Sequence, residues 1–447
     1  MKHFRTLLSL AALALVGPLQ AQQFYPGPAT GVRRGFSSIL MNPAEITSLH
    51  RTVELNLLQM NVGAGGNIED FIFNIDNPSG GLEESLTSRV DPLDFRLGGH
   101  FLGPSIAVRA GKIGVGLSSQ VHFGGDFANI NPNLGTALAQ FTDPDFTSTR
   151  IQGGPPQRAN FFSYAQLSAH AGGVLIEDAN SRLSIGASIH FYIPTAFAEA
   201  EVRNLNATLF EENGDLLMRD ATGSVRLAYS TGATLDGAEN FEVQGRVSLG
   251  LDIGATYLLK NTPLGHIQVG AALRNMGALL FDDALESSYA LNVPAGEALN
   301  LSALSGTFEE IENQLLASGF VSLRDQRSDL RVPLPTTLAL YGDFQPLPFL
   351  QVGAYFQKRL QANNPAGQIV GQDLFILTPS LFVGPLEVYF PTGVYEVFGF
   401  AAGAGLRLGG FFIGTSSGLS SALGRRNHAD VHFGLNLGIG KKLNLLN

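Results

Sequence analysis

Hydrophobic and polar residues alternate along much of this chain, most clearly between Arg246 and Asn275. The odd positions from Val247 to Leu259 are all apolar, and nearly all the even positions are small, polar or charged. Successive side chains of a strand point to opposite faces, so this pattern predicts a strand with one apolar face. The turn-forming residues 261–265 then lead into a second alternating segment. The stretch is therefore predicted to form a long β-hairpin.

The composition of the two faces indicates which solvent each one meets. The first strand of the hairpin has about 15 residues, more than the 9 to 11 that a tilted strand needs to cross a bilayer. Its polar face carries Gly, Ser and isolated charges instead of the Lys, Glu and Thr expected of a water-exposed sheet. We therefore expect the apolar face to contact lipid and the other face to line a narrow lumen. The predicted lumen-facing residues include His122, Asp126, His190, Asp252, Arg274 and His432.

The same alternation recurs along the chain and predicts an all-β fold. Turns of a few residues alternate with long connections, as in a bacterial outer-membrane barrel, whose strand number is even. The pattern predicts a closed antiparallel transmembrane β-barrel of about 14 strands over residues 49–447, with long outer loops and both termini in the periplasm. Residues 198–209 and 217–229 are assigned to an outer hairpin, although counting them as wall would give 16 strands. The predicted strands begin at Val53 and continue at 95–109, 113–127, 162–174, 183–193, 246–259, 266–274, 335–344, 350–358, 373–383, 386–391, 398–408, 411–417 and 431–439.

The first 21 residues have the features of a secretory signal peptide. Lys2 and Arg5 precede an apolar run from Leu10 to Val16, and Leu19-Gln20-Ala21 then predicts cleavage after Ala21. The alternative, an N-terminal membrane anchor, is disfavoured because the run is shorter than the roughly 20 residues of a spanning helix. The chain has no Cys, which excludes disulfides and thiolate metal sites. Export to the outer membrane is expected.

Residues 22–48 form a Gly- and Pro-rich leader without strand alternation. Asn42, Pro43 and Glu45 have the residue types of the N-cap, first and third positions of a short helix. One interpretation is a disordered leader. The interpretation that we prefer is a plug that folds back into the barrel and places Arg33 and Arg34 among inward acids.

Composition and charge agree with a membrane barrel. Gly accounts for 53 of the 447 residues, and charged residues for only 15%. Removal of Lys2 and Arg5 with the signal peptide changes the net charge from -10 to -12, which argues against a nucleic-acid partner. The expected partners are outer-membrane lipid, a small apolar ligand and, as an alternative, a secretion or envelope protein.

Several motifs resemble a known family. The sequence Asn42-Pro43-Ala44 after a Gly-rich leader resembles the superfamily of the outer-membrane long-chain fatty-acid transporter, in which an N-terminal segment plugs a fourteen-stranded barrel. Residues 251–257, 273–277, 333–336 and 432–437 resemble an uncharacterised Gram-negative outer-membrane family, domain of unknown function 5723. The resemblance implies architecture and no substrate. The chain departs from such barrels by ending without a terminal aromatic residue.

Candidate catalytic motifs are weak. Residues 414–418 match the G-x-S-x-G nucleophile elbow, and Asp430 and His432 follow in the order found in hydrolases. That elbow needs a strand-to-helix turn, whereas this match falls at a predicted strand end. The histidines lack paired metal spacing, and the Gly runs lack the lysine of a phosphate-binding loop. We expect no enzyme activity, no cofactor and no metal.

Two functional classes remain open. The first is a channel or transporter for small apolar molecules, gated by its N-terminal segment, with exit through the wall or the periplasmic end. The second is a scaffold or secretion partner, like the barrels beside type IX secretion machinery, with the outer loops as docking surfaces. In one outer loop, Thr307 and Glu310 predict a capped helix, as a packed loop helix or as a lid.

Overall fold

The computed structural model describes residues 29, 35–67, 91–141, 143, 145–231, 233, 243–262, 265–361, 366–425 and 427–442. The predicted signal peptide lies outside these residues, and so do Arg33 and Arg34. In this part of the chain no helix has the length and apolar character needed to cross a membrane.

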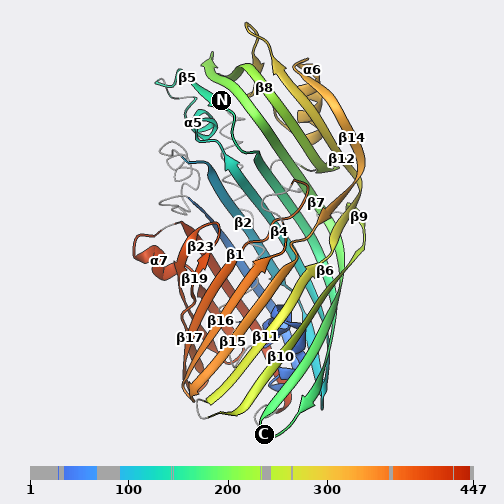
Figure 1. Cartoon of the computed structure of the whole chain (residues 1–447), viewed down its shortest axis with the longest axis vertical. Helices are drawn as coiled ribbons and strands as arrows, with labels where there is room; N and C mark the ends of the chain where they lie inside the picture. Colours follow the sequence, from blue (N-terminus) through green and yellow to red (C-terminus); the bar gives the residue numbers. More distant parts are fainter. Residues whose placement is uncertain are drawn as a thin grey trace.

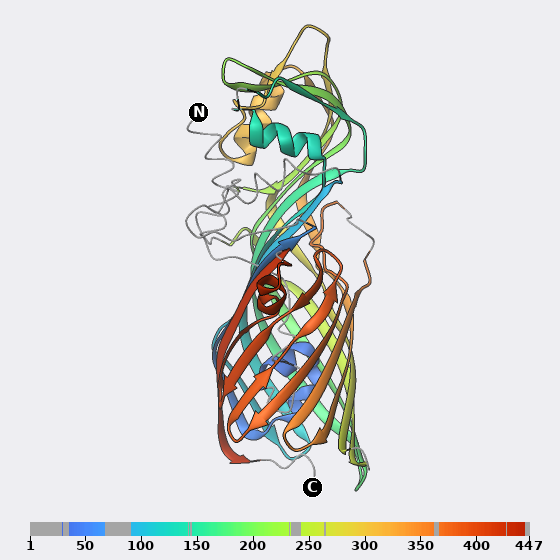
Figure 2. The ribbon, with the colours of Figure 1, turned by 90° about the vertical axis from the view of Figure 1, so that its left-hand side faces the viewer.

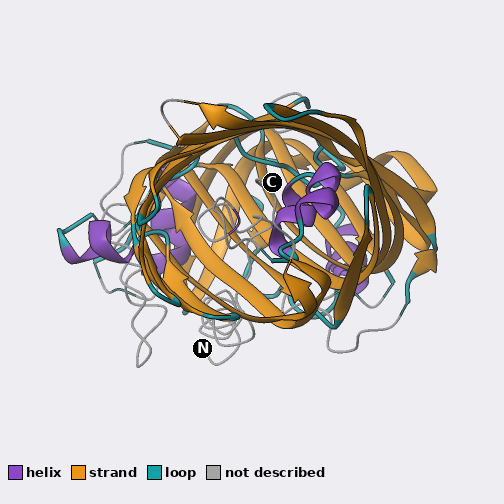
Figure 3. Ribbon diagram, turned by 90° about the horizontal axis from the view of Figure 1, so that it is seen from below, coloured by secondary structure: helices purple, strands orange, loops and turns teal. Residues whose placement is uncertain are grey.

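The lower part of the molecule is a closed antiparallel β-barrel of fourteen strands, as the sequence predicts (Figures 1 and 3). The first and last strands close the wall by pairing from Arg51 opposite Lys442 to Gly65 opposite His428. In the described chain the wall positions are occupied in order by β1 (Arg51–Gly66), β2 (Leu93–Leu102) with β3 (Ser105–Ala110), β4 (Ile113–Ile130), β6 (Gln157–Glu177), β7 (Ser181–Glu212), β10 (Ser248–Thr262), β11 (Gly265–Met276), β15 (Thr337–Leu347), β16 (Leu350–Arg359), β17 (Leu374–Val383), β18 (Leu386–Tyr389) with β19 (Thr392–Tyr395), β20 (Gly399–Ala402) with β21 (Ala404–Leu408), β22 (Phe411–Thr415) and β23 (His428–Lys442).

The two faces of the wall differ as the alternation predicts. On β10, Leu249 is 65% exposed and Ile253 is 42% exposed, whereas Asp252 between them is 5% exposed. The same pattern places exposed aliphatic and aromatic side chains on the outside of the other wall strands. An apolar outer surface around a closed barrel is the surface that lipid contacts, so the protein is an outer-membrane β-barrel.

Short turns join the wall strands at the lower end of the barrel. Gly111, Gly384 and Gly409 lie in three of these turns with φ of 59°, 59° and 60°, a conformation that L side chains rarely adopt. The last strand runs to the same end (Figure 1). It begins at His428, three residues before the predicted start. The long connections lie at the opposite end, as expected.

The described parts of the connections from β4 to β6, β7 to β10 and β11 to β15 fold into a unit above the barrel, here called the outer module (Figures 1 and 2). β7 continues out of the wall and forms the predicted outer hairpin with β8 (Asp215–Ser230). β12 (Ala278–Val293) pairs with β8 and with β14 (Val321–Pro333). The other elements of the outer module are α5 (Pro132–Gln140), β5 (Ser148–Gln152), β9 (Gly245–Arg246), β13 (Leu299–Asn300) and α6 (Phe308–Ala317).

The outer module has its own apolar core, which includes Leu209, Leu216 and Tyr289. α6 begins with the predicted capping box of Thr307 and Glu310, and Phe308 and Leu315 pack into that core. The strands β12 and β14 are absent from those that the sequence predicts. Most side chains of β14 are exposed on both faces, so its sequence lacks the alternation on which the strand predictions depended.

Two short helices lie inside the barrel: α3 (Ser37–Met41) and η1 (Pro43–Ser48), blue in Figure 2. Asn42 caps η1 by accepting a hydrogen bond from Ala44 N, and Pro43 takes the first position, as the sequence predicts. η1 is a 3₁₀-helix. A third short helix, α7 (Gly418–Ala422), joins β22 to β23.

Candidate functional site

Four glycines form a band across the inner face of the barrel wall, here called the glycine band. Gly114 on β4 lies opposite Gly172 on β6, Gly172 opposite Gly186 on β7, and Gly186 opposite Gly254 on β10. Because side chains at alternate positions point into the lumen, four glycines in register leave this part of the inner wall bare. The backbone of another segment can approach it closely.

The segment Asn42–Thr47 occupies that space. A Cβ at Gly254 would lie 2.1 Å from Asn42 Oδ1, and one at Gly186 would lie 2.5 Å from Ala44 N. A Cβ at Gly114 would lie 2.6 Å from Ile46 O. No alanine fits at these positions without a shift, so the glycine band and the segment are sterically matched.

Asn42 fixes the segment to two wall strands. Its Nδ2 donates to Ala255 O on β10 at 2.9 Å and to Ala271 O on β11 at 3.1 Å. Its Oδ1 accepts from Ala44 N at 2.9 Å, which orients the amide. The side chain thus joins the start of η1 to the wall, and it is fully buried.

Glu45 is a fully buried carboxylate on the same segment. Its Oε1 accepts hydrogen bonds from Gln268 Nε2, at 2.5 Å, and from the Tyr341 hydroxyl. A buried carboxylate is costly without such partners. These contacts therefore favour one position of η1 against β11 and β15.

α3 packs on the other side of the lumen through apolar side chains. One buried cluster joins Leu102 of β2 and Ala107 of β3 to apolar side chains at α3 and η1, namely Phe36, Ile39, Leu40, Ile46 and Leu49. The internal segment therefore contacts opposite parts of the wall, through polar groups at Asn42 and Glu45 and through apolar groups on α3.

Above α3 lies a small polar chamber of about 40 Å³, here called the lumen chamber. Ile39 and Leu40 line its lower side. A space of this size holds on the order of a few water molecules. Its remaining lining is polar or aromatic and consists of His100, Gln120, His122, Tyr164, Gln166, His170, Ser188, His190, Asp252, Arg274 and Asn275.

Imidazole rings dominate the lumen chamber. The ring of His122 stacks between those of His100 and Tyr164, with centroids 4.6 and 4.7 Å apart. His170 makes hydrogen bonds of 2.9 and 2.7 Å to serines 118 and 188. His190 Nε2 lies 3.2 Å from Asp252 Oδ1. The imidazole rings that line the chamber are therefore fixed by stacking and by hydrogen bonds to neighbouring side chains.

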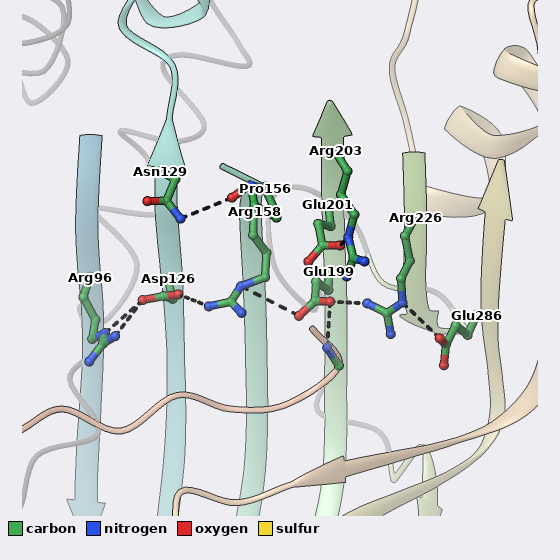
Figure 4. A network of polar contacts seen from close by, with 11 residues as sticks. Arg96, Asp126, Asn129, Pro156, Arg158, Glu199, Glu201, Arg203, Arg226 and Glu286 are labelled. Carbon is green, nitrogen blue, oxygen red and sulfur yellow. Dashed lines mark hydrogen bonds and ion pairs between the residues drawn. The ribbon is translucent and has the colours of Figure 1, made fainter. Parts of the chain in front are cut away.

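A row of alternating charges, here called the charge ladder, crosses the inner face of the barrel wall and continues onto strands of the outer module (Figure 4). Its members belong to the adjacent strands β2, β4, β6, β7, β8 and β12. Asp126 forms ion pairs with Arg96, at 2.9 Å between Nη2 and Oδ1, and with Arg158, at 2.6 Å between Nη2 and Oδ2. Glu199 pairs with Arg226, whose Nε also lies 2.9 Å from Glu286 Oε1. Each inner charge has an opposite charge on the neighbouring strand, which compensates for its burial.

Residues 366–373, here called the outer strap, run along this row. Gly367 N donates to Glu199 Oε1 at 2.8 Å, and Arg96 Nη1 donates to Gly371 O at 3.2 Å. Between these contacts Ile369 is fully buried in an apolar cluster with Phe197 and other residues of the wall and module. The outer strap therefore runs between contacts with β7 and β2 at the junction of barrel and outer module.

The lumen-facing residues predicted from the sequence are brought together in part. His122, His190, Asp252 and Arg274 all line the lumen chamber. Asp126 belongs to the charge ladder instead. His432 is buried on β23, with Nε2 2.9 Å from the Tyr389 hydroxyl. Asn42 and Pro43 lie on the glycine band.

The residues of the candidate hydrolase motif have other partners. Ser417 Oγ donates to Asp430 Oδ1 at 2.7 Å, and Ser416 N donates to the same carboxylate at 2.8 Å. His432 Nδ1 lies 3.7 Å from Asp430 Oδ2, and its Nε2 is 2.9 Å from the Tyr389 hydroxyl, so in these contacts the carboxylate and not the imidazole meets the serine. The recorded contacts thus tie the end of β22 to β23 and do not form a charge relay.

Some residues of the site escaped the sequence analysis. His100 and His170 were not singled out, although their strand positions share the face of His122. Glu45 was read only as a helix residue, and nothing local in the sequence marks residues 366–373. In the described residues, no group of His, Asp and Glu side chains is arranged to hold a metal ion.

The model of a family of unknown function (DUF5723) matches residues 43–416 of this chain. No curated protein matches it in sequence. The chain resembles the toluene transporter TbuX of Ralstonia pickettii, with 12% identity, 92% of this chain and 95% of that chain covered, and a TM-score of 0.45.

Two further solved structures resemble it. The toluene transporter TodX of Pseudomonas putida shares 9% identity over 91% of this chain and 93% of that one, with a TM-score of 0.43. A Pseudomonas aeruginosa FadL homologue shares 11% identity over 93% and 96%, with a TM-score of 0.31.

Proposed function

The chain belongs to the family of unknown function DUF5723, and we propose that it is an outer-membrane channel for small molecules whose lumen is closed by its own N-terminal segment, residues 22–48. The observation that carries this proposal is the match between the glycine band and Asn42–Thr47. A segment needed only for stability would pack on ordinary side chains. Here the wall has glycine at the four paired positions of the glycine band, and the backbone of the segment lies against them.

The contacts of the segment support a reversible closure. Asn42 and Glu45 attach it by a few hydrogen bonds, each of which contributes only about 0.5 to 1.5 kcal/mol net. Buried apolar side chains at α3 and η1 add contacts with Leu102 and Ala107. A segment held in this way can leave the wall without unfolding the barrel, whose strands are paired independently of it.

The wall offers an exit for an apolar solute beside α3. β2 ends at Leu102 and β3 begins at Ser105, so Gly103 and Pro104 interrupt the strand that the sequence predicts as continuous. A hollow of about 400 Å³ lies on the lipid side of this interruption. Its lining joins exposed Leu57 and Ile106 to buried Asn56. Movement of α3 would uncover Leu102 on the lumen side, which supports small apolar molecules as the cargo.

The experiment that tests this function compares solute flux through liposomes containing the mature chain or a chain without residues 22–48. We expect slow flux for the mature chain and fast flux for the deletion, because the glycine band is then unoccupied. The liposomes carry lipopolysaccharide in their outer leaflet, because toluene crosses a plain phospholipid bilayer without a channel, and toluene and a neutral sugar of similar size serve as matched apolar and polar probes. Equal flux in both proteins, or none in either, would refute a channel gated by this segment.

The ordered outer module favours a second candidate, a scaffold for an envelope protein. Its apolar core and its capped helix α6 make it a folded surface and not a set of loose loops. Crosslinking in cells followed by purification tests this candidate. Recovery of the barrel alone would argue against it.

A further inference from the structure

A hollow of about 360 Å³ opens between the outer module and the outer strap, here called the outer vestibule. One side is formed by β8, β12 and β14, and the other by Ala366, Gly367 and Gln368 of the strap. The outer vestibule therefore lies at the end of the charge ladder.

Three guanidinium groups line the outer vestibule, those of Arg226, Arg327 and Arg331. Two carboxylates, Glu286 and Asp329, also line it, so its lining carries a net charge of +1 in a chain whose net charge is -10. The guanidinium groups of the lining thus outnumber its carboxylates.

The three arginines differ in how firmly they are held. Arg226 is held between Glu199 and Glu286. Arg327 makes only an exposed pair with Asp325, at 3.2 Å with both side chains more than half exposed, and such a pair is weak. Arg331 is exposed and makes no ion pair within the described residues. Two of the three groups are therefore available to an anionic ligand.

Arg226 connects this hollow to the strap. The same Oε1 of Glu199 that pairs with Arg226 accepts the hydrogen bond from Gly367 N. A Cβ on Gly367 would lie 2.8 Å from Arg226 Nη2, so the strap backbone rests directly on the guanidinium. A ligand that attracts Arg226 therefore changes the contacts that hold Gly367.

We propose that the outer vestibule binds a small solute bearing a phosphate group, and that binding draws Arg226 toward the ligand and loosens the outer strap. Guanidinium groups pair with phosphate through parallel N–H···O bonds. A phosphate presents three terminal oxygens in three directions, one for each guanidinium group, whereas a carboxylate presents two oxygens in one plane. This inference rests on the proposed channel function, because it makes the strap a second closure of the lumen.

Binding is tested by calorimetry on the full mature chain in detergent at low salt. Glycerol 2-phosphate and glycerol form a probe pair that differs by the phosphate, and acetate tests for a carboxylate. We expect binding of the phosphate alone, weakened roughly tenfold by Arg331→Gln, the change typical of losing one charge-assisted hydrogen bond. The control is Arg324→Gln, because this exposed residue on the same strand does not line the hollow.

The effect on the strap is tested with a single thiol, since the chain has no Cys. Ile369→Cys places it in the strap, and Val332→Cys places it in the same buried cluster on β14. We expect glycerol 2-phosphate to speed maleimide labelling at residue 369 several-fold and to leave residue 332 unchanged. Val370→Cys, also buried, replaces the strap variant if Ile369→Cys does not fold.

Each outcome decides the inference. Equal affinity for acetate, binding of glycerol, or equal weakening by Arg324→Gln would overturn the phosphate site. Binding without faster labelling at residue 369 or 370 would overturn its link to the strap. Neither readout uses flux, so a failed flux experiment with the deletion of residues 22–48 would count against the channel and leave the binding result standing.

Discussion

Replacing Gly254 with alanine is expected to open the lumen. The new Cβ would lie 2.1 Å from Asn42 Oδ1 and 2.7 Å from Asn42 Cγ, so the Asn42 side chain has to move. Its hydrogen bonds to Ala255 O and Ala271 O are then lost while the barrel wall keeps its pairing. The substitution therefore weakens the closed position of the segment more than it weakens the fold.

The size of the effect follows from those two hydrogen bonds. At about 0.5 to 1.5 kcal/mol net for each, their loss costs about 1 to 3 kcal/mol. Since 1.4 kcal/mol changes an equilibrium tenfold, the open fraction should rise roughly fivefold to a hundredfold. Asn42→Ala should have a similar effect. The double variant should add little, because both changes remove the same contact.

Single-channel recording in planar bilayers measures the open fraction. The matched control is Gly342→Ala on wall strand β15, where a Cβ meets nothing closer than 3.6 Å. We expect the control to behave as the unchanged protein does. Equal open fractions for Gly254→Ala and Gly342→Ala, or additive effects of Gly254→Ala and Asn42→Ala, would refute the reasoning.

Three further predictions concern the wall, the charge ladder and the outer module. Leu251→Arg, on the lipid face, should destabilise the barrel by about 2 to 4 kcal/mol in urea unfolding from liposomes, well beyond Leu251→Ala, and similar losses would contradict the assigned facing. Arg158→Gln should cost about 3 kcal/mol because it removes the buried cation between Asp126 and Glu199, which then keep only Arg96 and Arg226, whereas Arg246→Gln, at an exposed pair with Asp282, should cost little. Burial, and then the hydrogen bond to Glu312, raises the pKa of Tyr289 from 10 to about 12. The stability that this tyrosine contributes is therefore complete below pH 10 and lost as the pH rises through 12. Near-ultraviolet circular dichroism should show this loss, and an unchanged profile for Tyr289→Phe would count against it.

The wall strands could be predicted from the sequence because lipid and lumen impose opposite demands on alternate residues. Leu249, Leu251 and Ile253 face lipid, and Asp252 faces the lumen, so the period of two is strict there. The start of η1 was equally readable, because Asn42 and Pro43 have local roles at a helix N-terminus. These signals depend only on neighbours in the sequence.

The remaining features depend on contacts between distant residues. Gly114, Gly172, Gly186 and Gly254 become one band only once the register of four strands is known. The position of residues 366–373 depends on partners such as Glu199, 168 residues away from Gly367. β14 was missed for a different reason, since a strand exposed on both faces has no apolar period to detect.

The most direct test of the closed lumen is a redox-controlled lock between segment and wall. The double variant Asn42→Cys and Gly254→Cys introduces two thiols into this cysteine-free chain. A Cβ at residue 254 lies 2.7 Å from Asn42 Cγ, so the two Cβ atoms are within the roughly 4 Å that a disulfide needs. Conductance is recorded from one channel before and after addition of a reductant. We expect the oxidised channel to stay closed and the reduced channel to open, since reduction leaves the segment without its Asn42 hydrogen bonds. Equal conductance in the two states, with the disulfide shown to be formed and then broken, would contradict closure by this segment.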